Sequence, residues 1–305
     1  MLFVDLLKQK DGKTAPEFEK LFSNIIQNQT HSGDLLLVRL NGSYRPSVRE
    51  NASLNLNPYV TGPFEMGLSE STHYEFIHQY RTTFLFEDTY ASYLKLIKYS
   101  PERAQEIEDI TRKETLWLQI EMLIYLKIWE MDIFIKKMYQ LTRLSHGEEY
   151  DWHFKITESN RDQEATGTRQ EIIRKKVRDR LKEEYPNIYQ LIKNAYQTQV
   201  RNAIAHSKYS VRDRYIQLYN YIKQDQSAQL KSIDFLDWTD KFHDTIVIYN
   251  QLIGFMNKVN EYYSKIAKDG SLKVEVRINR TDLVARTEKR LIKYRPEFND
   301  WHGVP

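Results

Sequence analysis

The feature that most restricts the fold is the stretch 101–145, in which apolar residues follow a helical period. One face is marked at steps of three and four residues by Ile120, Ile124, Ile128, Met131, Ile135 and Met138. Further large apolar residues widen this face until little of the helix is polar. A helix of this kind belongs in the buried centre of a bundle. Glu121 and Glu130 on it then need partners or a route to solvent.

The composition is consistent with a helical protein that has a large core. The chain of 305 residues contains 41% hydrophobic residues, with 21 Tyr, 13 Phe and only 10 Gly. Its 45 Lys and Arg nearly balance its 42 Asp and Glu, which excludes a polycation. The absence of cysteine excludes disulfides, cysteine-ligated metal centres and a thiol nucleophile.

The sequence also bears on location. Asp5 lies near the start and no long apolar run follows it, which is not typical of a secretory signal. Charges at Lys127 and Asp132 interrupt the most apolar region before it reaches the length of a membrane span. We therefore expect a cytoplasmic protein with no membrane partner.

Residues 1–98 predict a mixed α/β region of unknown role. We expect a helix opened by Pro16 and a strand in the apolar run LLLVRL. A loop rich in proline, a second helix and one further element should follow. The predicted ranges, in chain order, are 17–28 for the first helix, 35–40 for the strand, 41–63 for the loop, 71–80 for the second helix and 84–96 for the last element.

Residues 99–270 predict a helical domain. After a polar loop at 146–167, residues 169–182 form an amphipathic helix whose outer face is basic. Pro186 should then begin a helix that ends near His206. A hairpin of strands 209–211 and 214–221 and a final helix from Asp237 or Thr239 to about 268 complete the domain.

Residues 271–305 predict a tail made of a strand, LKVEVRI from Leu272, and a short basic helix at 282–294. The fold class is thus mainly α, with a small β-hairpin and a mixed α/β N-terminal region. The chain has no phosphate-binding glycine pattern, because its glycines are few and scattered.

The segment VRNAIAHSKY, residues 200–209, carries the chemistry that we consider most informative. Arg201 offers a planar and permanently charged fork for phosphate oxygens, and His206 can move a proton in either direction near neutral pH. Both groups suit the cleavage of a phosphodiester. Lys208, Arg212 and the basic helix, through Arg174, Lys175 and Arg178, would attract an RNA backbone. Tyr209 or the hairpin tyrosines would stack on bases.

Arg201 and His206 are five positions apart, so on an ideal helix they diverge by about 140°. Asn202 and His206 are four apart and share a face. Three arrangements would bring Arg201 and His206 to one phosphate: a fully extended arginine, a helix that ends before His206, or a second copy of the chain. The small residues Ala203 and Ala205 would allow a second helix to approach closely.

This pattern resembles that of the HEPN superfamily, in which an arginine, a polar residue and a histidine end the penultimate helix of an up-and-down helical bundle. The resemblance covers about residues 100–268. It implies a metal-independent endoribonuclease that works as a homodimer without a cofactor. It further implies that His206 transfers protons during attack of the ribose 2′-hydroxyl, that Arg201 stabilises the phosphate and that Asn202 orients the pair. Such proteins serve as toxins, abortive-infection effectors or antiviral nucleases, so an antitoxin or defence-system partner is expected.

Two other classes of function remain open. The first is a non-catalytic module of the same type that binds RNA or a protein. The second is a metal-dependent hydrolase built on the polar loop, with the candidate ligands His146, Glu148, Glu149, Asp151 and His153.

Overall fold

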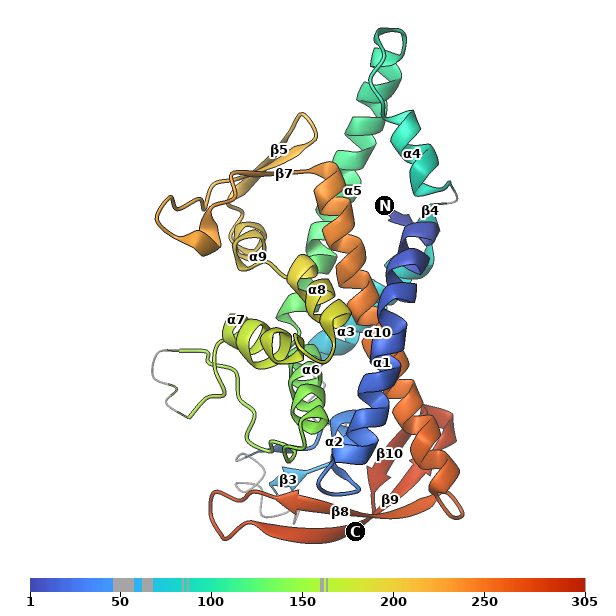
Figure 1. Cartoon of the computed structure of the whole chain (residues 1–305), viewed down its shortest axis with the longest axis vertical. Helices are drawn as coiled ribbons and strands as arrows, with labels where there is room; N and C mark the ends of the chain where they lie inside the picture. Colours follow the sequence, from blue (N-terminus) through green and yellow to red (C-terminus); the bar gives the residue numbers. More distant parts are fainter. Residues whose placement is uncertain are drawn as a thin grey trace. The chain divides into compact units, whose positions relative to one another are not determined.

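Helices dominate the architecture, and the sheets are small (Figure 1). The computed structural model describes residues 1–45, 58–61, 68–83, 85–86, 88–159, 162 and 164–304. A mainly α fold with a small β-hairpin is confirmed. Most of the predicted loop 41–63 lies outside the described residues.

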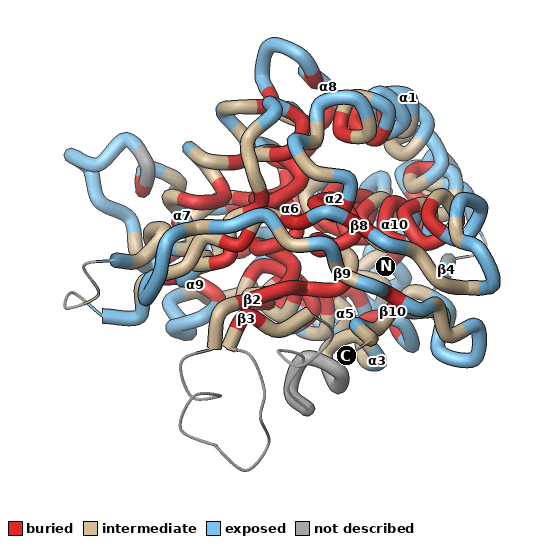
Figure 2. Tube along the Cα trace, turned by 90° about the horizontal axis from the view of Figure 1, so that it is seen from below, coloured by how far each residue is buried: buried red, intermediate tan, exposed pale blue. Residues whose placement is uncertain are grey.

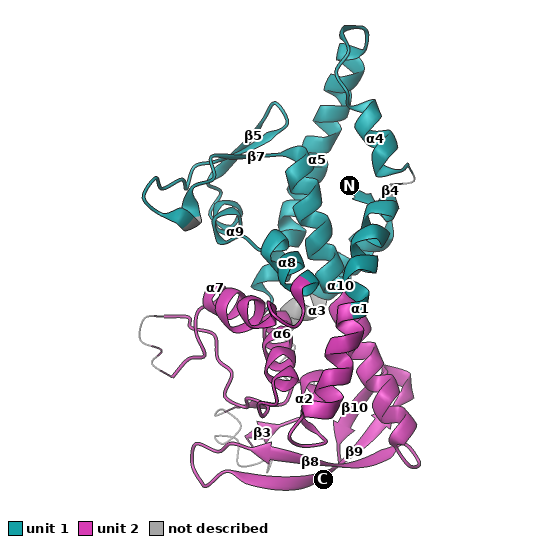
Figure 3. Ribbon diagram, viewed as in Figure 1, with its two compact units in different colours: residues 1–16, 71–131, 187–250 teal, residues 17–70, 132–186, 251–305 magenta. Residues whose placement is uncertain are grey.

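The chain divides into two compact units, and each unit combines three separate stretches (Figure 3). Unit 1 consists of residues 1–16, 71–131 and 187–250, and unit 2 of residues 17–70, 132–186 and 251–305. Pro16, Met131 and Pro186 stand at three of the boundaries. The linear division into 1–98, 99–270 and 271–305 stays a prediction.

Two long helices contribute residues to both units. They are α1 (Val4–Asn28) and α10 (Phe235–Ile266). The prediction that Pro16 begins a helix was wrong, because Pro16 lies inside α1. Proline costs an internal helix one hydrogen bond, and here the helix continues because its apolar side chains Leu21, Phe22 and Ile25 are buried.

Unit 1 contains α5 (Ala104–Glu130), which follows a 3₁₀ turn at Pro101–Arg103, together with parts of α1 and α10. Its shorter helices, in the part of the chain that the structure describes, are α3 (Leu68–Thr83), α4 (Tyr90–Leu96), α8 (Pro186–Ala195) and α9 (Thr198–Ala205). A short parallel pair joins β1 (Leu2–Phe3) to β4 (Leu85–Phe86). An antiparallel sheet contains, in order, β5 (Tyr209–Arg212), β6 (Tyr215–Leu218) and β7 (Ser232–Asp234).

The helical signal at 101–145 belongs to two helices rather than one. The chain is extended at Met131, with φ −73° and ψ 107°, and α6 (Asp132–Ser145) begins immediately afterwards in unit 2. Figure 2 shows buried residues along α6, α2 and part of α10. The predicted burial is therefore confirmed for α6, whereas the single continuous helix is not.

Glu121 on α5 has the partners that its burial requires. It is 3% exposed and accepts hydrogen bonds from the hydroxyl of Tyr80 (3.1 Å) and the indole nitrogen of Trp238 (2.7 Å). Trp238 also stacks on Phe242 with an interplanar angle of 12°. This polar contact at the centre of unit 1 joins α3, α5 and α10.

Unit 2 contains the helices α2 (Asp34–Leu40) and α6 and the helical segment that begins with α7 (Arg169–Glu171). That segment continues as a π-helical turn at Ile172–Arg178 and a 3₁₀ turn at Asp179–Leu181. The predicted apolar stripe of the basic helix is buried, as Ile172, Ile173, Val177 and Leu181 show. Two-stranded pairing joins β2 (Ser43–Tyr44) to β3 (Tyr59–Val60).

The predicted strand at 35–40 was wrong, since these residues form α2. Leu35, Leu36 and Leu37 are completely buried, and a run that is buried on all sides has no periodicity to separate a strand from a helix. Asn41 ends the helix in the left-handed conformation, with φ 57°. Asparagine is one of the residues that favour this position.

The predicted short helix at 282–294 was also wrong. The C-terminal tail forms an antiparallel sheet in the order β10 (Asp300–Gly303), β9 (Arg286–Arg295), β8 (Ser271–Ile278). The strand predicted from Leu272 is confirmed as β8. Its pairing with β9 extends from Ser271–Lys293 to Ile278–Arg286, so long-range hydrogen bonds make the basic segment a strand.

Candidate active site

The predicted helix 186–206 is interrupted in unit 1, and the interruption sets the position of the motif. The hydroxyl of Tyr125 donates to the carbonyl of Ala195 (3.1 Å) and accepts from the backbone nitrogen of Gln197 (3.3 Å). Tyr125 is fully buried on α5. It thus satisfies backbone groups that the end of α8 and the start of α9 leave unpaired.

Helix α9 packs one face into unit 1 and presents the other outward. Val200, Ala203 and Ile204 are buried. Arg201 and Asn202 are half-buried, while Ala205 and His206 are exposed. Because Ala203 lies in the core of its own unit, only Ala205 of the two small residues is accessible to another helix.

The end of α9 has the hydrogen bonds of a Schellman motif. The backbone nitrogen of Lys208 donates to the carbonyl of Ala203 (2.7 Å), and that of Ser207 donates to Ile204 (3.2 Å). Ser207 adopts a φ of +52° where glycine is common. His206 is the last residue before this turn, so the helix ends before the histidine, which is one of the three arrangements that the spacing allows.

Arg201 is held by two groups of unit 1. Its Nε forms an ion pair with Glu130, and its Nη1 donates to the side-chain oxygen of Asn202 (2.7 Å). The side chain of Arg201 is 20% exposed and that of Glu130 is 32% exposed. Glu130, which the sequence showed to need a partner, therefore positions the arginine. Its role at the site was missed because the two residues are 71 positions apart.

His206 stands apart from this network. Within the described part of the chain, its imidazole makes no hydrogen bond or ion pair, and it is exposed. The structure thus joins Arg201 to Asn202 and Glu130, and it does not bring the imidazole of the same chain into contact with them. An exposed imidazole is accessible to a large substrate.

The hairpin that follows His206 continues the candidate site. Asp213 and Arg214 form its two-residue turn, both with positive φ, 48° and 64°. Tyr209 is half-buried, and its hydroxyl donates to the side chain of Gln119 (2.7 Å). Lys208 and Arg212 are exposed. Of the three hairpin residues predicted to bind substrate, the two cations are therefore accessible and the tyrosine is held against α5.

A buried carboxylate anchors the turn of the hairpin. Glu114 on α5 is 5% exposed and accepts hydrogen bonds from Arg214 and from the hydroxyl of Tyr93. Burial raises the pKa of Glu114 to about 7, and the charge of Arg214 opposes this rise. The folded protein therefore binds the Glu114 proton more tightly than the unfolded chain does.

This raised pKa predicts a pH dependence of stability. Between the ordinary value of 4.5 and about 7, the folded state binds more protons than the unfolded state, so stability falls as the pH rises. Relative to Glu114→Gln, the wild type should lose up to about 3 kcal/mol of unfolding free energy between about pH 4.5 and pH 8. Urea unfolding, monitored by circular dichroism at a series of pH values, measures this difference in unfolding free energy. Glu108→Gln, at a side chain 64% exposed on the same helix, is the control, and parallel curves for wild type and Glu114→Gln would refute the effect.

The basic helix belongs to unit 2, whereas the motif belongs to unit 1. Arg174 and Arg178 are half-buried and Lys175 is exposed. The guanidinium of Arg178 pairs with Asp179 (2.6 Å). Contact of these residues with the substrate stays a prediction.

The candidate metal ligands of the polar loop are engaged separately. Glu148 pairs with Arg143 and Arg180, and Glu149 faces Arg277 at 3.4 Å. The imidazole of His146 contacts the carbonyl of Thr142 (2.8 Å). Among the residues that the structure describes, no three His, Asp or Glu side chains are grouped to hold one metal ion.

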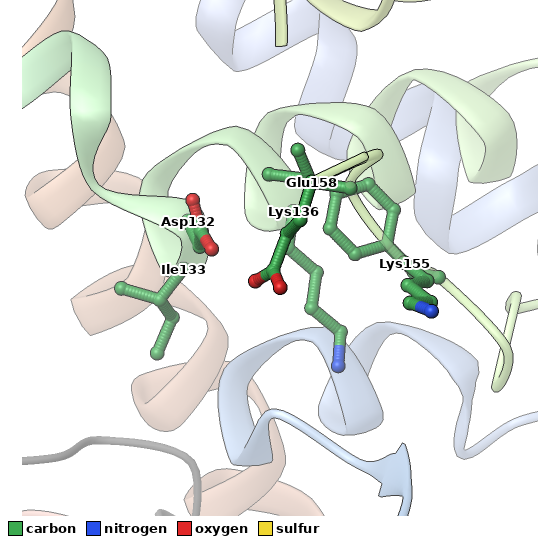
Figure 4. A pocket seen from close by; sticks show the side chains of 7 residues that line it. Asp132, Ile133, Lys136, Lys155 and Glu158 are labelled. Carbon is green, nitrogen blue, oxygen red and sulfur yellow. The ribbon is translucent and has the colours of Figure 1, made fainter. Parts of the chain in front are cut away.

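A pocket of about 290 Å³ lies in unit 2 (Figure 4). Its lining is Asp132, Ile133, Lys136, Phe154, Lys155, Ile156 and Glu158. Its charges are largely matched by neighbours: Asp132 pairs with Arg169 (2.7 Å), Lys155 with Asp162 (2.9 Å), and Lys136 donates to the carbonyl of Gly42 (3.2 Å). No lining residue belongs to the motif.

The described helices are each too short or too polar to span a lipid bilayer. Comparison of the chain with protein-family models, with curated proteins and with solved structures finds no match.

Proposed function

We propose that this protein is a metal-independent endoribonuclease with an active site formed by Arg201, Asn202 and His206. The observation that carries the proposal is the arrangement at the end of α9. There Arg201 is oriented by Glu130 and Asn202, and an exposed imidazole follows at the helix terminus. A fixed cationic fork and an accessible proton carrier are the groups that phosphodiester cleavage requires.

In the proposed reaction, His206 accepts the proton of a ribose 2′-hydroxyl. The 2′-oxygen then bonds to phosphorus and the bond from phosphorus to the 5′-oxygen breaks. The leaving oxygen takes up a proton from a second imidazole, and the products are a 2′,3′-cyclic phosphate and a 5′-hydroxyl. Arg201 stabilises the charge that develops on the phosphate oxygens.

The second imidazole would come from a second copy of the chain. His206 follows the last residue of α9, and in the described part of the chain its imidazole makes no contact with the arginine network. A homodimer with two motifs in one cleft would supply an arginine and a histidine from different copies. Such an arrangement, and the up-and-down bundle that accompanies it, is what the resemblance to the HEPN superfamily implies.

A toxin, abortive-infection or antiviral role in the cytoplasm, restrained by an antitoxin or another defence-system partner, is the biological setting that this family resemblance suggests. Lys208 and Arg212 would contact the RNA backbone beside the motif, and Arg174, Lys175 and Arg178 would add attraction from unit 2.

The ion pair between Glu130 and Arg201 favours a second candidate, a non-catalytic module that binds RNA or protein. A carboxylate already occupies one edge of the arginine fork, so a phosphate has to compete for its charge. In that case the protein would bind RNA without generating a cyclic phosphate.

Replacement of Arg201 by lysine distinguishes these candidates. Lysine keeps the charge but lacks the planar fork, in which separate nitrogens contact Glu130, Asn202 and a phosphate. We expect cleavage to fall about 10²–10³-fold, the usual effect of losing one electrostatic contact in the transition state. The measurement is single-turnover cleavage of end-labelled RNA in EDTA, with detection of the 2′,3′-cyclic phosphate.

Arg212→Lys is the matched control. The Arg212 side chain is 80% exposed, and its proposed contact with the phosphates of the RNA requires only a positive charge. This variant should retain cleavage within a few fold. If Arg201→Lys formed the cyclic phosphate as fast as the wild type does, the proposed role of Arg201 would be wrong. Absence of cyclic phosphate with the wild type would favour the non-catalytic module.

A further inference from the structure

We propose that the outward face of the sheet β5–β6–β7 is a platform on which unpaired bases of single-stranded RNA stack. The platform consists of Lys208, Arg212, Tyr215, Gln217 and Tyr219. This inference rests on the proposed function and deepens it, because it names the single-stranded class of substrate and a binding surface beside the motif.

The side chains of β6 alternate between the core and the outside. Ile216 and Leu218 are buried, whereas Tyr215 and Tyr219 are 48% and 64% exposed. Alternate residues of a strand share a face, so Tyr215 and Gln217 point to the same side. Tyr219 directly follows β6, and its backbone hydrogen bond to Lys208 continues the ladder by one residue. At about 3.4 Å per residue, the two tyrosines are about 14 Å apart along the strand.

The register of the hairpin places a cation directly across from each tyrosine. Arg212 on β5 pairs with Tyr215 on β6. Beyond the last pair of the ladder, the backbone nitrogen of Tyr219 donates to the carbonyl of Lys208 (2.8 Å), which puts these residues opposite each other. Directly opposed residues in an antiparallel pair lie on one face.

The ring of Tyr219 is restrained before any ligand binds. Its hydroxyl lies 2.6 Å from the hydroxyl of Ser210 on the neighbouring strand. A restrained ring loses less entropy when a base stacks on it. Tyr209, by alternation, belongs to the opposite face of β5, where it contacts Gln119, so it is not part of the platform.

The charge of the sheet is net positive, which suits a nucleic acid. Residues 208–234, which include all three strands, contain five Lys or Arg and three Asp. Asp234 pairs with Tyr215 across the sheet, and its carboxylate accepts a hydrogen bond from the backbone nitrogen of Asp237 (2.8 Å). Arg214 is engaged by Glu114, and Asp213 partly neutralises Arg212 at 3.2 Å. Lys208, Lys223 and Lys231 remain around the sheet, and Lys231 lies 5.3 Å from the ring centre of Tyr221.

Exposed aromatic rings alternating with cations suit single-stranded nucleic acid better than a duplex. In a duplex the faces of the bases are stacked on one another, whereas unpaired bases can stack on tyrosine while lysine and arginine contact the phosphates. The platform also begins next to the proposed site, since Lys208 is two residues from His206. RNA bound to it would therefore lie beside the exposed imidazole.

The test is binding of a fluorescently labelled, single-stranded 2′-O-methyl RNA to the full chain, followed by fluorescence anisotropy. This probe has no 2′-hydroxyl to attack, so binding is measured apart from cleavage. Tyr215→Ala and Tyr219→Ala should each weaken binding about 5- to 100-fold, the range for loss of one base–aromatic stack. Neither tyrosine variant should change the salt dependence of binding. Lys208→Ala should reduce, by about one, the slope of the logarithm of the binding constant against the logarithm of the salt concentration.

Two controls separate stacking from general damage. Tyr219→Phe keeps the ring but loses the contact with the Ser210 hydroxyl, so it should bind more tightly than Tyr219→Ala. Tyr99→Ala removes a tyrosine that is 71% exposed elsewhere in unit 1 and should bind normally. The matching RNA duplex should bind more weakly and should not respond to Tyr215→Ala or Tyr219→Ala.

The proposal is overturned if the wild type does not bind the probe, or if Tyr215→Ala with Tyr219→Ala binds as the wild type does. Loss of self-association in that double variant, with RNA binding intact, would assign the face to a protein contact instead. The outcomes for catalysis are separate. If probe binding depends on Tyr215 and Tyr219 but natural RNA is not cleaved, only the proposed nuclease activity is refuted. If natural RNA is cleaved but probe binding does not depend on these tyrosines, only the platform is refuted.

Discussion

Replacement of His206 by alanine should lower RNA cleavage about 10²–10⁴-fold, because general acid–base catalysis contributes a factor of this size. The imidazole is exposed and makes no polar contact within the described part of the chain. Its removal should therefore change the free energy of unfolding by no more than about 0.5 kcal/mol. Single-turnover cleavage of RNA and urea unfolding measure the two effects.

His78→Ala is the matched control, since His78 is an exposed histidine of the same unit, on α3. It should retain cleavage at the rate of the wild type. If His206→Ala also retained that rate, the assignment of His206 would be wrong. If EDTA abolished cleavage by the wild type, the chemistry would depend on a metal and the proposed mechanism would fail.

Replacement of Trp238 by alanine should produce the largest loss of stability. The side chain is 1% exposed, stacks on Phe242 and lies with its ring centre 5.5 Å from that of Tyr125. Truncation of a buried tryptophan leaves a cavity and typically costs about 3–5 kcal/mol. Glu121 would in addition lose the hydrogen bond from the indole nitrogen. Urea unfolding followed by far-UV circular dichroism provides the measurement.

Two further variants divide this effect between packing and hydrogen bonding. Trp238→Phe keeps much of the ring but removes the donor to Glu121, so it should cost about 1–3 kcal/mol. Tyr99→Ala, at an exposed position of unit 1, should cost less than about 0.5 kcal/mol. A loss below about 1 kcal/mol for Trp238→Ala would show that the core of unit 1 does not depend on this side chain.

Local patterns were sufficient to predict the elements whose two faces differ. The stripe of Ile172, Ile173, Val177 and Leu181 correctly identified the buried side of the basic helix. The alternation around Arg212 and Asp213 correctly predicted a hairpin, although the turn consists of Asp213 and Arg214. In each case the contrast between apolar and polar positions follows from burial of one side only.

Elements that are uniform in character could not be assigned from local pattern. The run at Leu35–Leu40 is buried except for Arg39, and the segment at Arg286–Arg295 is strongly basic. The former became a helix and the latter a strand. Packing decided the first and pairing with β8 decided the second, and both depend on residues far away in the chain.

The candidate site divides in the same way. The spacing of Arg201, Asn202 and His206 is the basis of the proposed function, which stays a prediction, and the end of the helix near His206 was predicted correctly. The ion pair with Glu130, the break at Ala195–Gln197 held by Tyr125, and the inward position of Tyr209 were not predictable. Each of them joins α5 to residues of the motif region.

The sequence by itself therefore determined a mainly helical protein, the amphipathic faces of its helices and the residue types of the motif on which the proposed function rests. These properties depend on the order of neighbouring residues, which sets the periodicity and the choice of side chains. The tertiary structure decided where the helices break, which residues hold Arg201 and which face of the hairpin is exposed. Those outcomes depend on contacts between distant segments, because burial and hydrogen bonding of a side chain are settled only when its partners are in place.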